Sequence, residues 1–121
     1  MAGRIGGIIQ FAIDGESYLA KGAFTYNINK FKKEKIAGSD QVHGHKVLPQ
    51  VLFIEGALTD TKALDLQALF DAEDVTCTLE LANGKVIVLE RAVFAGDGNV
   101  STEEGEIEVR FEGEDGREIA G

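Results

Sequence analysis

The two histidines, His43 and His45, are the residues whose type and spacing come nearest to a metal site. Residues two apart on a strand point to the same side, so both imidazoles could face one ion. Zinc sites, however, use about three or four protein ligands, and the chain has no third histidine and a single cysteine, Cys77. Asp40 or a distant glutamate would have to complete the set. The sequence therefore favours a polar loop over a metal site, and we expect no cofactor.

Covalent catalysis has no better support. The chain contains neither the G-x-S-x-G motif of a nucleophilic serine nor a phosphate-binding P-loop. Cys77 alternates with Leu79 and Leu81, which places its thiol among the apolar side chains of a strand. In the acidic stretch at residues 97–108, Asp97, Asn99, Ser101 and Glu108 have the spacing of ligands in a calcium-binding EF-hand loop. Thr102, however, occupies the position where that loop needs glycine for its sharp turn. We therefore predict that the protein is not an enzyme.

Length and composition indicate a globular protein. A chain of 121 residues, of which 44% are hydrophobic, is typical of one compact domain, so we expect a single domain over residues 1–121. Its lone cysteine excludes an internal disulfide. The chain contains no apolar run long enough to cross a bilayer, and we expect no membrane partner.

Charge is distributed unevenly along the chain, whose net charge is −9. Residues 1–50 carry seven lysines and arginines against four acids, whereas residues 51–121 carry five against seventeen. Affinity for nucleic acid comes from basic side chains that neutralise phosphates, so this balance argues against a protein that wraps DNA or RNA. The basic cluster K-F-K-K-E-K at residues 30–35 has an acidic complement in residues 97–121. This complementarity predicts head-to-tail association between copies of the chain.

Strand signals dominate the sequence. Asp-Gly and Asn-Gly pairs occur four times, and such pairs favour the tight turns of β-hairpins. The clearest hairpin joins V-T-C-T-L-E-L-A to K-V-I-V-L-E-R-A-V-F through Asn83 and Gly84. A two-residue turn there places Leu79 opposite Val88. In this register one side of the hairpin carries Thr76, Thr78, Glu80, Ile87 and Leu89.

A single helix is predicted among the strands. The segment at about residues 61–71 is rich in helix-forming residues, and Asp60 or Thr61 can cap its first turn. The segment at about residues 30–50 is too long for a simple hairpin connection, which indicates a functional loop. The expected fold is therefore mainly β with a minor α part. It is an antiparallel β-sandwich or a partly closed β-barrel, with one short helix and a long loop.

Several stretches together resemble one protein family. They follow one another over nearly the whole chain and read I-G-G-I-I-Q-F-A-I-D-G, K-G-A-F-T-Y-N-I, V-H-G-H-K-V-L-P-Q, I-E-G-A-L-T-D, L-E-L-A-N-G-K-V-I-V-L and T-E-E-G-E-I-E-V-R-F-E. In order and spacing they resemble the tail tube proteins of Mu-like contractile-tailed bacteriophages. None of these motifs is a chemical signature, so the resemblance rests on their number and their order.

The resemblance implies a structural virion protein. Its hexameric rings would stack as the inner tube of a contractile tail, through which DNA passes without specific binding. Its partners would be further copies of itself and the tail sheath, tape measure and baseplate proteins. It would be located in the virion tail after assembly in the host bacterial cytoplasm, and an infectious phage, a prophage or a bacteriocin particle could each encode it.

The resemblance also assigns roles to residues. The long loop would reach to neighbouring subunits through Lys30, Lys32, Lys33, Lys35, Asp40, Val42, His43, His45 and Lys46. An acidic lumen would repel phosphates and let a duplex slide. The candidates for the lumen surface are polar or acidic at every second position of two strands, namely Thr76, Thr78, Glu80, Glu106, Glu108 and Glu112.

The alternative hypothesis is a monomeric small β-barrel that binds a ligand. Apolar residues on both sides of the central hairpin would then form a cavity wall. The chain has only seven Phe, two Tyr and no Trp with which to line a pocket.

Overall fold

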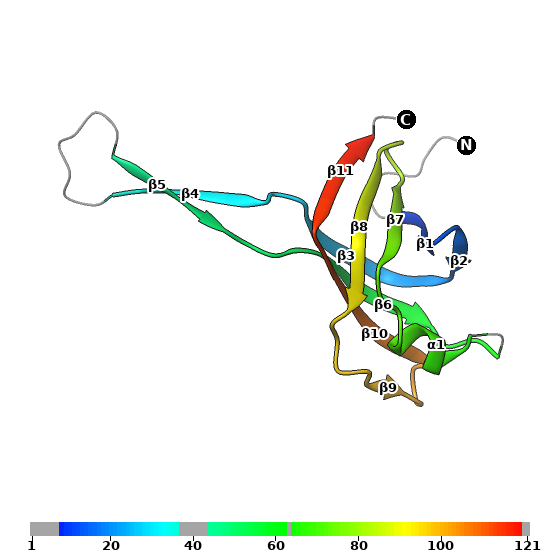
Figure 1. The fold of residues 1–121 in the computed structure, drawn as a ribbon. Coiled ribbons are helices and arrows are strands. Elements are labelled where there is room, and N and C mark those ends of the chain that lie inside the picture. Colours follow the sequence, from blue (N-terminus) through cyan, green and yellow to red (C-terminus); the bar gives the residue numbers. More distant parts are fainter. Residues whose placement is uncertain (1–7, 37–43, 63, 120–121) are drawn as a thin grey trace.

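Extended backbone makes up most of the chain. The computed structural model describes residues 8–36, 44–62 and 64–119, and the strand pairings in these residues are antiparallel (Figure 1). The elements are β1 Ile8–Ile13, β2 Glu16–Tyr18, β3 Ala20–Asn27, β4 Phe31–Lys35, β5 His45–Pro49, β6 Leu52–Thr59, α1 Leu66–Phe70, β7 Val75–Leu81, β8 Val86–Phe94, β9 Val100–Ser101, β10 Glu106–Gly113 and β11 Asp115–Ile119.

The strands of the body form two layers that are joined at one corner (Figure 1). The β1 layer has the order β2-β1-β7-β8-β11, and the β6 layer has the order β3-β6-β10-β9. Strand β8 joins them, because Val93 and Phe94 at its end pair with Glu112 and Phe111 of β10. A bulge in β8 beside Arg91, whose φ is 53°, accompanies the bend. These sheets do not close into a barrel, so the predicted antiparallel β-sandwich is confirmed for the described residues.

A row of phenylalanines forms the centre of the core. Adjacent rings have centroids 5.2 to 5.9 Å apart and are, in order, Phe24, Phe11, Phe111, Phe94 and Phe70. Because these rings come from β3, β1, β10, β8 and α1, the row ties both layers and the helix together. Fully buried residues from four strands surround it, namely Ile54, Leu58, Cys77, Leu79, Ile87, Leu89 and Ile107.

The hairpin of β7 and β8 turns through three residues instead of the two that the sequence predicted. The N–H of Leu81 donates to the carbonyl of Lys85 at 2.8 Å, which leaves residues 82–84 as the loop. Gly84 provides the positive φ, 96°, that such a loop requires. The predicted register is therefore wrong by one residue, because Leu79 lies opposite Ile87 and not opposite Val88.

The corrected register gives each strand of this hairpin one buried side. A shift of one residue moves every side chain of a strand to the other face of its sheet. Ile87 and Leu89 therefore join Leu79 in the core, and all three have no exposed surface. The outward side carries Thr76, Thr78, Glu80, Val86 and Val88.

Helix α1 is shorter than predicted and begins later. It spans Leu66–Phe70, and the carboxylate of Asp65 accepts a hydrogen bond from the N–H of Ala68 at 3.2 Å as its N-cap. The predicted caps, Asp60 and Thr61, are wrong, because Thr61 belongs to a separate turn whose carbonyl accepts from the N–H of Leu64. Among the described residues this is the one α-helix, as expected.

The segment at residues 30–50 is more regular than the long loop that the sequence predicted. In its described parts β4 pairs with β5, from Phe31 opposite Pro49 to Lys35 opposite His45. The alternation of this segment was hidden because lysines occupy both sides of β4. Residues 37–43 of the predicted loop lie outside the described residues.

Replacing Phe111 by alanine should lower the free energy of unfolding by about 3–5 kcal/mol, because it leaves a cavity in the middle of the aromatic row. Chemical denaturation of the unassembled chain measures this change. The matched control is Phe31→Ala, whose side chain is 50% exposed on β4 and should cost no more than about 0.5 kcal/mol. Equal losses in the two variants would contradict the assignment of the core.

Candidate functional site

A hairpin that projects away from both layers is the most distinctive feature of the molecule (Figure 1). This arm consists of β4, β5 and the described residues next to them, 30, 36, 44 and 50. The pairing of β3 with β6, with Tyr26 opposite Ile54, continues in the same register into the arm. At the root the N–H of Gln50 donates to the carbonyl of Lys30 at 3.0 Å. The arm is therefore a direct extension of the β6 layer.

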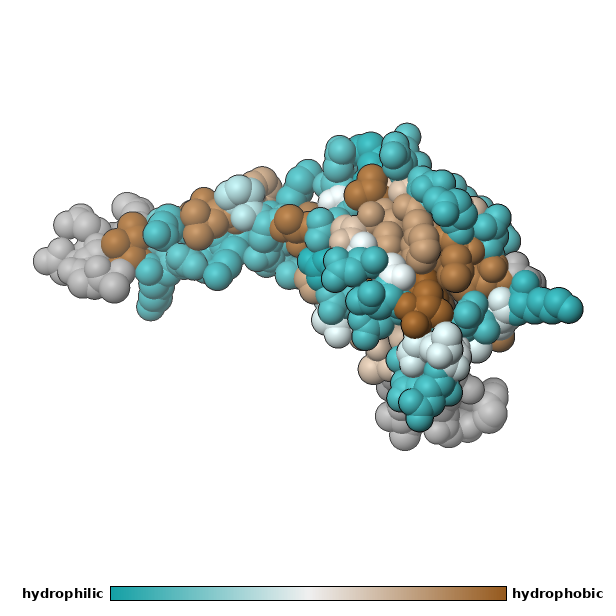
Figure 2. All heavy atoms as spheres, turned by 90° about the horizontal axis from the view of Figure 1, so that it is seen from below, coloured by the Kyte–Doolittle hydropathy of each residue, from teal (hydrophilic) through white to brown (hydrophobic). Residues whose placement is uncertain are grey.

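The arm has no second layer of its own to pack against. Phe31 and Val47 are 50% and 51% exposed, and Ile36 and Leu48 are also exposed. Figure 2 shows these apolar surfaces as separate patches along the arm between polar side chains. A lone two-stranded hairpin is marginally stable in water at best. The arm thus presents unburied apolar side chains in a form suited to another protein surface.

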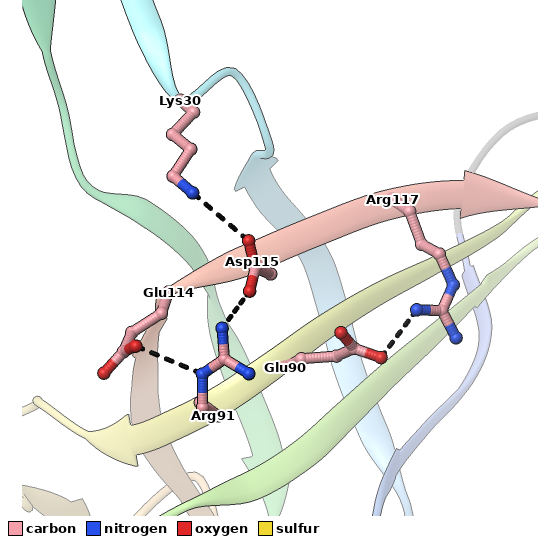
Figure 3. A network of polar contacts seen from close by, with 6 residues as sticks. All are labelled: Lys30, Glu90, Arg91, Glu114, Asp115 and Arg117. Atoms are coloured by element: carbon pink, nitrogen blue, oxygen red, sulfur yellow. Dashed lines mark hydrogen bonds and ion pairs between the residues drawn. The ribbon is translucent and has the colours of Figure 1, made fainter.

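A network of charged side chains joins the root of the arm to the body (Figure 3). The ammonium of Lys30 lies 3.2 Å from a carboxylate oxygen of Asp115 at the start of β11. Arg91 contacts the other oxygen of Asp115, and its Nε lies 3.1 Å from Glu114. The bulge in β8 turns Arg91 outward toward these two acids. Asp115 therefore links Lys30 at the root of the arm to Arg91 of β8.

The network shifts the pKa values of two of its members, Asp115 and Arg91. The pKa of Asp115 is below its ordinary value, chiefly because Lys30 donates a hydrogen bond to its carboxylate, and Arg91 adds to the effect. The hydrogen bond to Glu114 raises the pKa of the Arg91 guanidinium, so this side chain stays charged. Both groups are exposed, so these ion pairs orient the arm more than they stabilise the fold.

The outward face of the β6 layer is acidic. Glu106, Glu108 and Glu112 alternate along β10 with residues of the core, so these three predicted residues share one side of the sheet. Glu55 of β6 lies on the same side, opposite Arg110. Together with the loop that follows β8, this face forms an open groove of about 480 Å³.

The basic residues of this face are paired with its own acids. Arg110 contacts Glu55, and its Nε donates to Glu112 at 2.8 Å. Its guanidinium also stacks 4.1 Å from the centre of the Phe53 ring. Lys21 lies 3.6 Å from Glu106. The β6 layer thus presents carboxylates outward, with its cations already neutralised.

The outward face of the β1 layer has a different character. Thr76, Thr78 and Glu80 lie there, half-buried, on the opposite side of the sandwich from the glutamates of β10. Val86 lies beside them, Val88 there is only 6% exposed, and Ile119 at the end of β11 is 45% exposed. Arg117 and Glu90 lie on the same side and pair at 2.6 Å. This face therefore mixes valines with threonines and paired charges, and it lacks the row of glutamates that β10 presents. The structure separates the six predicted lumen residues into two sets that face opposite ways.

The predicted loop residues are distributed over both sides of the arm. Lys30 lies at its root, Lys32 and Lys46 lie on one side, and Lys33, Lys35 and His45 lie on the other. Asp40, Val42 and His43 lie outside the described residues. The sequence prediction missed the apolar residues of the arm, although a phenylalanine within the lysine cluster was a signal that could have found them. It also missed the pairing of Arg110 with Glu55.

Other chemistry finds little basis in the structure. Cys77 is fully buried, and this burial raises the pKa of its thiol to about 12, so the group reacts slowly at neutral pH. Among the described residues no three His, Cys, Asp or Glu side chains gather as a metal site. The same residues contain no helix with the length and apolar character needed to cross a membrane.

Comparison with known families finds one match. Residues 2–118 match the model of the phage tail tube protein family, which covers nearly the whole chain. A comparison with curated proteins found no significant match.

Replacing Lys30 by methionine should raise the pKa of Asp115 toward its ordinary value, because it removes the largest cause of the lowered pKa. The ion pair contributes above the unfolded pKa and is lost as the pH falls through the lower, folded pKa. An NMR titration of the carboxyl group measures the shift. Lys33→Met, on the arm but away from Asp115, is the control that should change nothing; an unchanged pKa in Lys30→Met would contradict the network.

Proposed function

Since the chain belongs to the phage tail tube protein family, we propose that it forms stacked hexameric rings that make the inner tube of a contractile tail. Membership of this family makes it a structural component of the virion tail. In the proposed tube the chain contacts copies of itself, the tail sheath surrounds it, and baseplate proteins meet its end. The tape measure protein, and later DNA, occupies the lumen without specific binding.

The unpartnered arm is the observation that carries this proposal. The arm projects from the body of its own chain (Figure 1), and its apolar side chains are exposed. A marginal hairpin gains stability when a further surface covers it. In a ring of identical subunits, the body of a neighbouring copy provides that surface. The arm would then bury Phe31 and Val47 against a second copy, which is the contact that joins subunits.

Charge supports the same partner. The described part of the arm carries five lysines and one glutamate, whereas residues 51–121 carry seventeen acids against five basic residues. Surfaces of opposite charge attract one another within a Debye length of about 8–10 Å, and surfaces of like charge repel one another. The basic arm of one copy is therefore complementary to the acidic body of the next.

The face of the β6 layer is the better candidate for the lumen. A conduit for DNA should offer no free cations to phosphates, because each such contact would retain the duplex. The β6 layer presents Glu106, Glu108 and Glu112, and its Arg110 and Lys21 are paired with carboxylates. We therefore assign Glu106, Glu108 and Glu112 to the lumen. The face with Thr76, Thr78 and Glu80, which lacks such a row of glutamates, is assigned to contacts with surrounding protein.

The rival hypothesis, a monomeric barrel that binds a ligand, has less support. The described sheets leave the barrel open, and the space between the two layers is filled by the aromatic row. The groove on the β6 layer is open and lined by carboxylates, unlike the enclosed apolar pockets of most ligand-binding proteins. An arm with exposed apolar residues also has no role in such a protein.

Deleting residues 31–49 should abolish assembly without unfolding the body. The hydrogen bond between Gln50 and Lys30 brings the two ends together, so a short glycine-containing turn can join them. Electron microscopy and sedimentation of the purified chain should reveal tubes for the intact protein and monomers for the deletion. A thermal melt serves as the control for folding. Tubes formed by the deleted chain would refute the role of the arm.

Cysteine labelling can test which face lines the lumen. The native Cys77 is buried and reacts slowly, so an added cysteine dominates the reaction with a maleimide on a bulky polymer. Glu108→Cys should react readily before assembly and be protected in tubes. Thr78→Cys, on the opposite face, should keep most of its reactivity in tubes without a sheath. The reverse pattern would assign the lumen to the β1 layer.

A further inference from the structure

The two sides of the arm differ in how their charges are satisfied. We propose that the arm docks on a second copy of the chain through one side alone, which we name the cationic face, and this rests on the proposed function above. Residues opposite one another in an antiparallel pair lie on the same side of the hairpin. By the register of β4 and β5, the cationic face consists of Phe31, Lys33, Lys35, His45, Val47 and Pro49.

The other side of the arm neutralises its own lysines. Glu34 lies between Lys32 and Lys46, with oxygen-to-nitrogen distances of 3.1 Å and 3.9 Å. Leu48 and Ile36, which are 37% and 48% exposed, are the apolar residues on this neutralised face, so the two sides differ in their charges and not in their apolar content. A carboxylate on a partner would have to compete with Glu34 for both lysines. The neutralised face therefore gains little from an acidic partner.

The cationic face has no such internal partner among the described residues. Its side of the hairpin holds Lys33 and Lys35 without a carboxylate between them. Phe31 and Val47, each about half exposed, lie in the same stripe. Charges that are not satisfied within the arm, placed beside apolar side chains, match a partner surface that has carboxylates next to an apolar patch. Such an interface buries the apolar area and pairs the lysines at once.

A second copy of the chain fits this description. Its residues 51–121 carry an excess of twelve acids over basic residues, so the surface of the body is rich in carboxylates that the lysines could pair with. Nucleic acid would also attract the lysines, but phosphates offer nothing to Phe31 and Val47. The apolar half of the cationic face thus favours a protein partner, and binding to DNA becomes an outcome of the test.

The chain offers a matched pair of variants for this test. Lys33→Gln with Lys35→Gln removes two charges from the cationic face, and Lys32→Gln with Lys46→Gln removes two from the neutralised face. We expect the first pair to raise the critical concentration for tube assembly by about tenfold or more, and the second by less than about twofold. Val47→Asp and Leu48→Asp make the same comparison for the apolar residues. Sedimentation measures assembly, and a thermal melt of each unassembled variant verifies its fold.

Each outcome decides the proposal. A loss of assembly confined to Lys33, Lys35 and Val47 supports docking through the cationic face. Equal losses for both sides would overturn the choice of face while leaving the arm as the joining element. Normal assembly of all variants would overturn it too. Tubes formed by the arm deletion would refute the role of the arm, whereas the proposed function itself would fail if the intact chain formed no tubes. Wild-type binding to a labelled DNA duplex that Lys33→Gln with Lys35→Gln abolishes, with assembly unchanged, would replace the second copy by nucleic acid.

Discussion

The pairing of β3 with β6 is the constraint on which the rest of the molecule depends. Within the body this ladder places Phe24 and Ile54 in the core, and beyond the body it continues in register as β4 and β5. The register of Thr25–Asn27 with β6 is therefore the register of the arm as well, and a bulge between Lys21 and Thr25 separates it from the start of β3. Because the arm projects from the body, its apolar side chains stay exposed within the described structure, and we propose that a second copy covers them.

Charge divides the molecule in the same way as the fold does. Basic residues gather on the arm, and the body neutralises many of its own cations on the surface, as Arg110 does with Glu55 and Glu112. At the junction Asp115 binds Lys30 and Arg91, so the root is held by pairs of opposite charge (Figure 3). Exposed ion pairs add little to stability. Their value here lies in orientation, because they fix the root of the arm relative to β8 and β11.

The sequence predicted a mainly β fold, either a sandwich or a partly closed barrel, with one short helix, because period-2 alternation and Asx-Gly turns are local signals. The role of residues 30–50 in assembly stays a prediction. The sequence placed Val88 instead of Ile87 opposite Leu79, because Asn83 and Gly84 are compatible with both a two-residue and a three-residue loop. The arm was read as a loop, because the alternation of a strand is visible only when one side is buried. The sequence also could not show which outward face of the sandwich is acidic, because that depends on how distant strands pair.

Whether the arm joins copies of the chain would be decided by an electron cryomicroscopy map of the assembled tube. The account predicts that β4 and β5 of each subunit lie on the body of another copy, with Phe31 and Val47 buried and Lys33 and Lys35 beside its carboxylates. In the same map Glu108 should face the lumen. An arm that folds back on its own body, or that extends into solvent with these residues uncovered, would contradict the account.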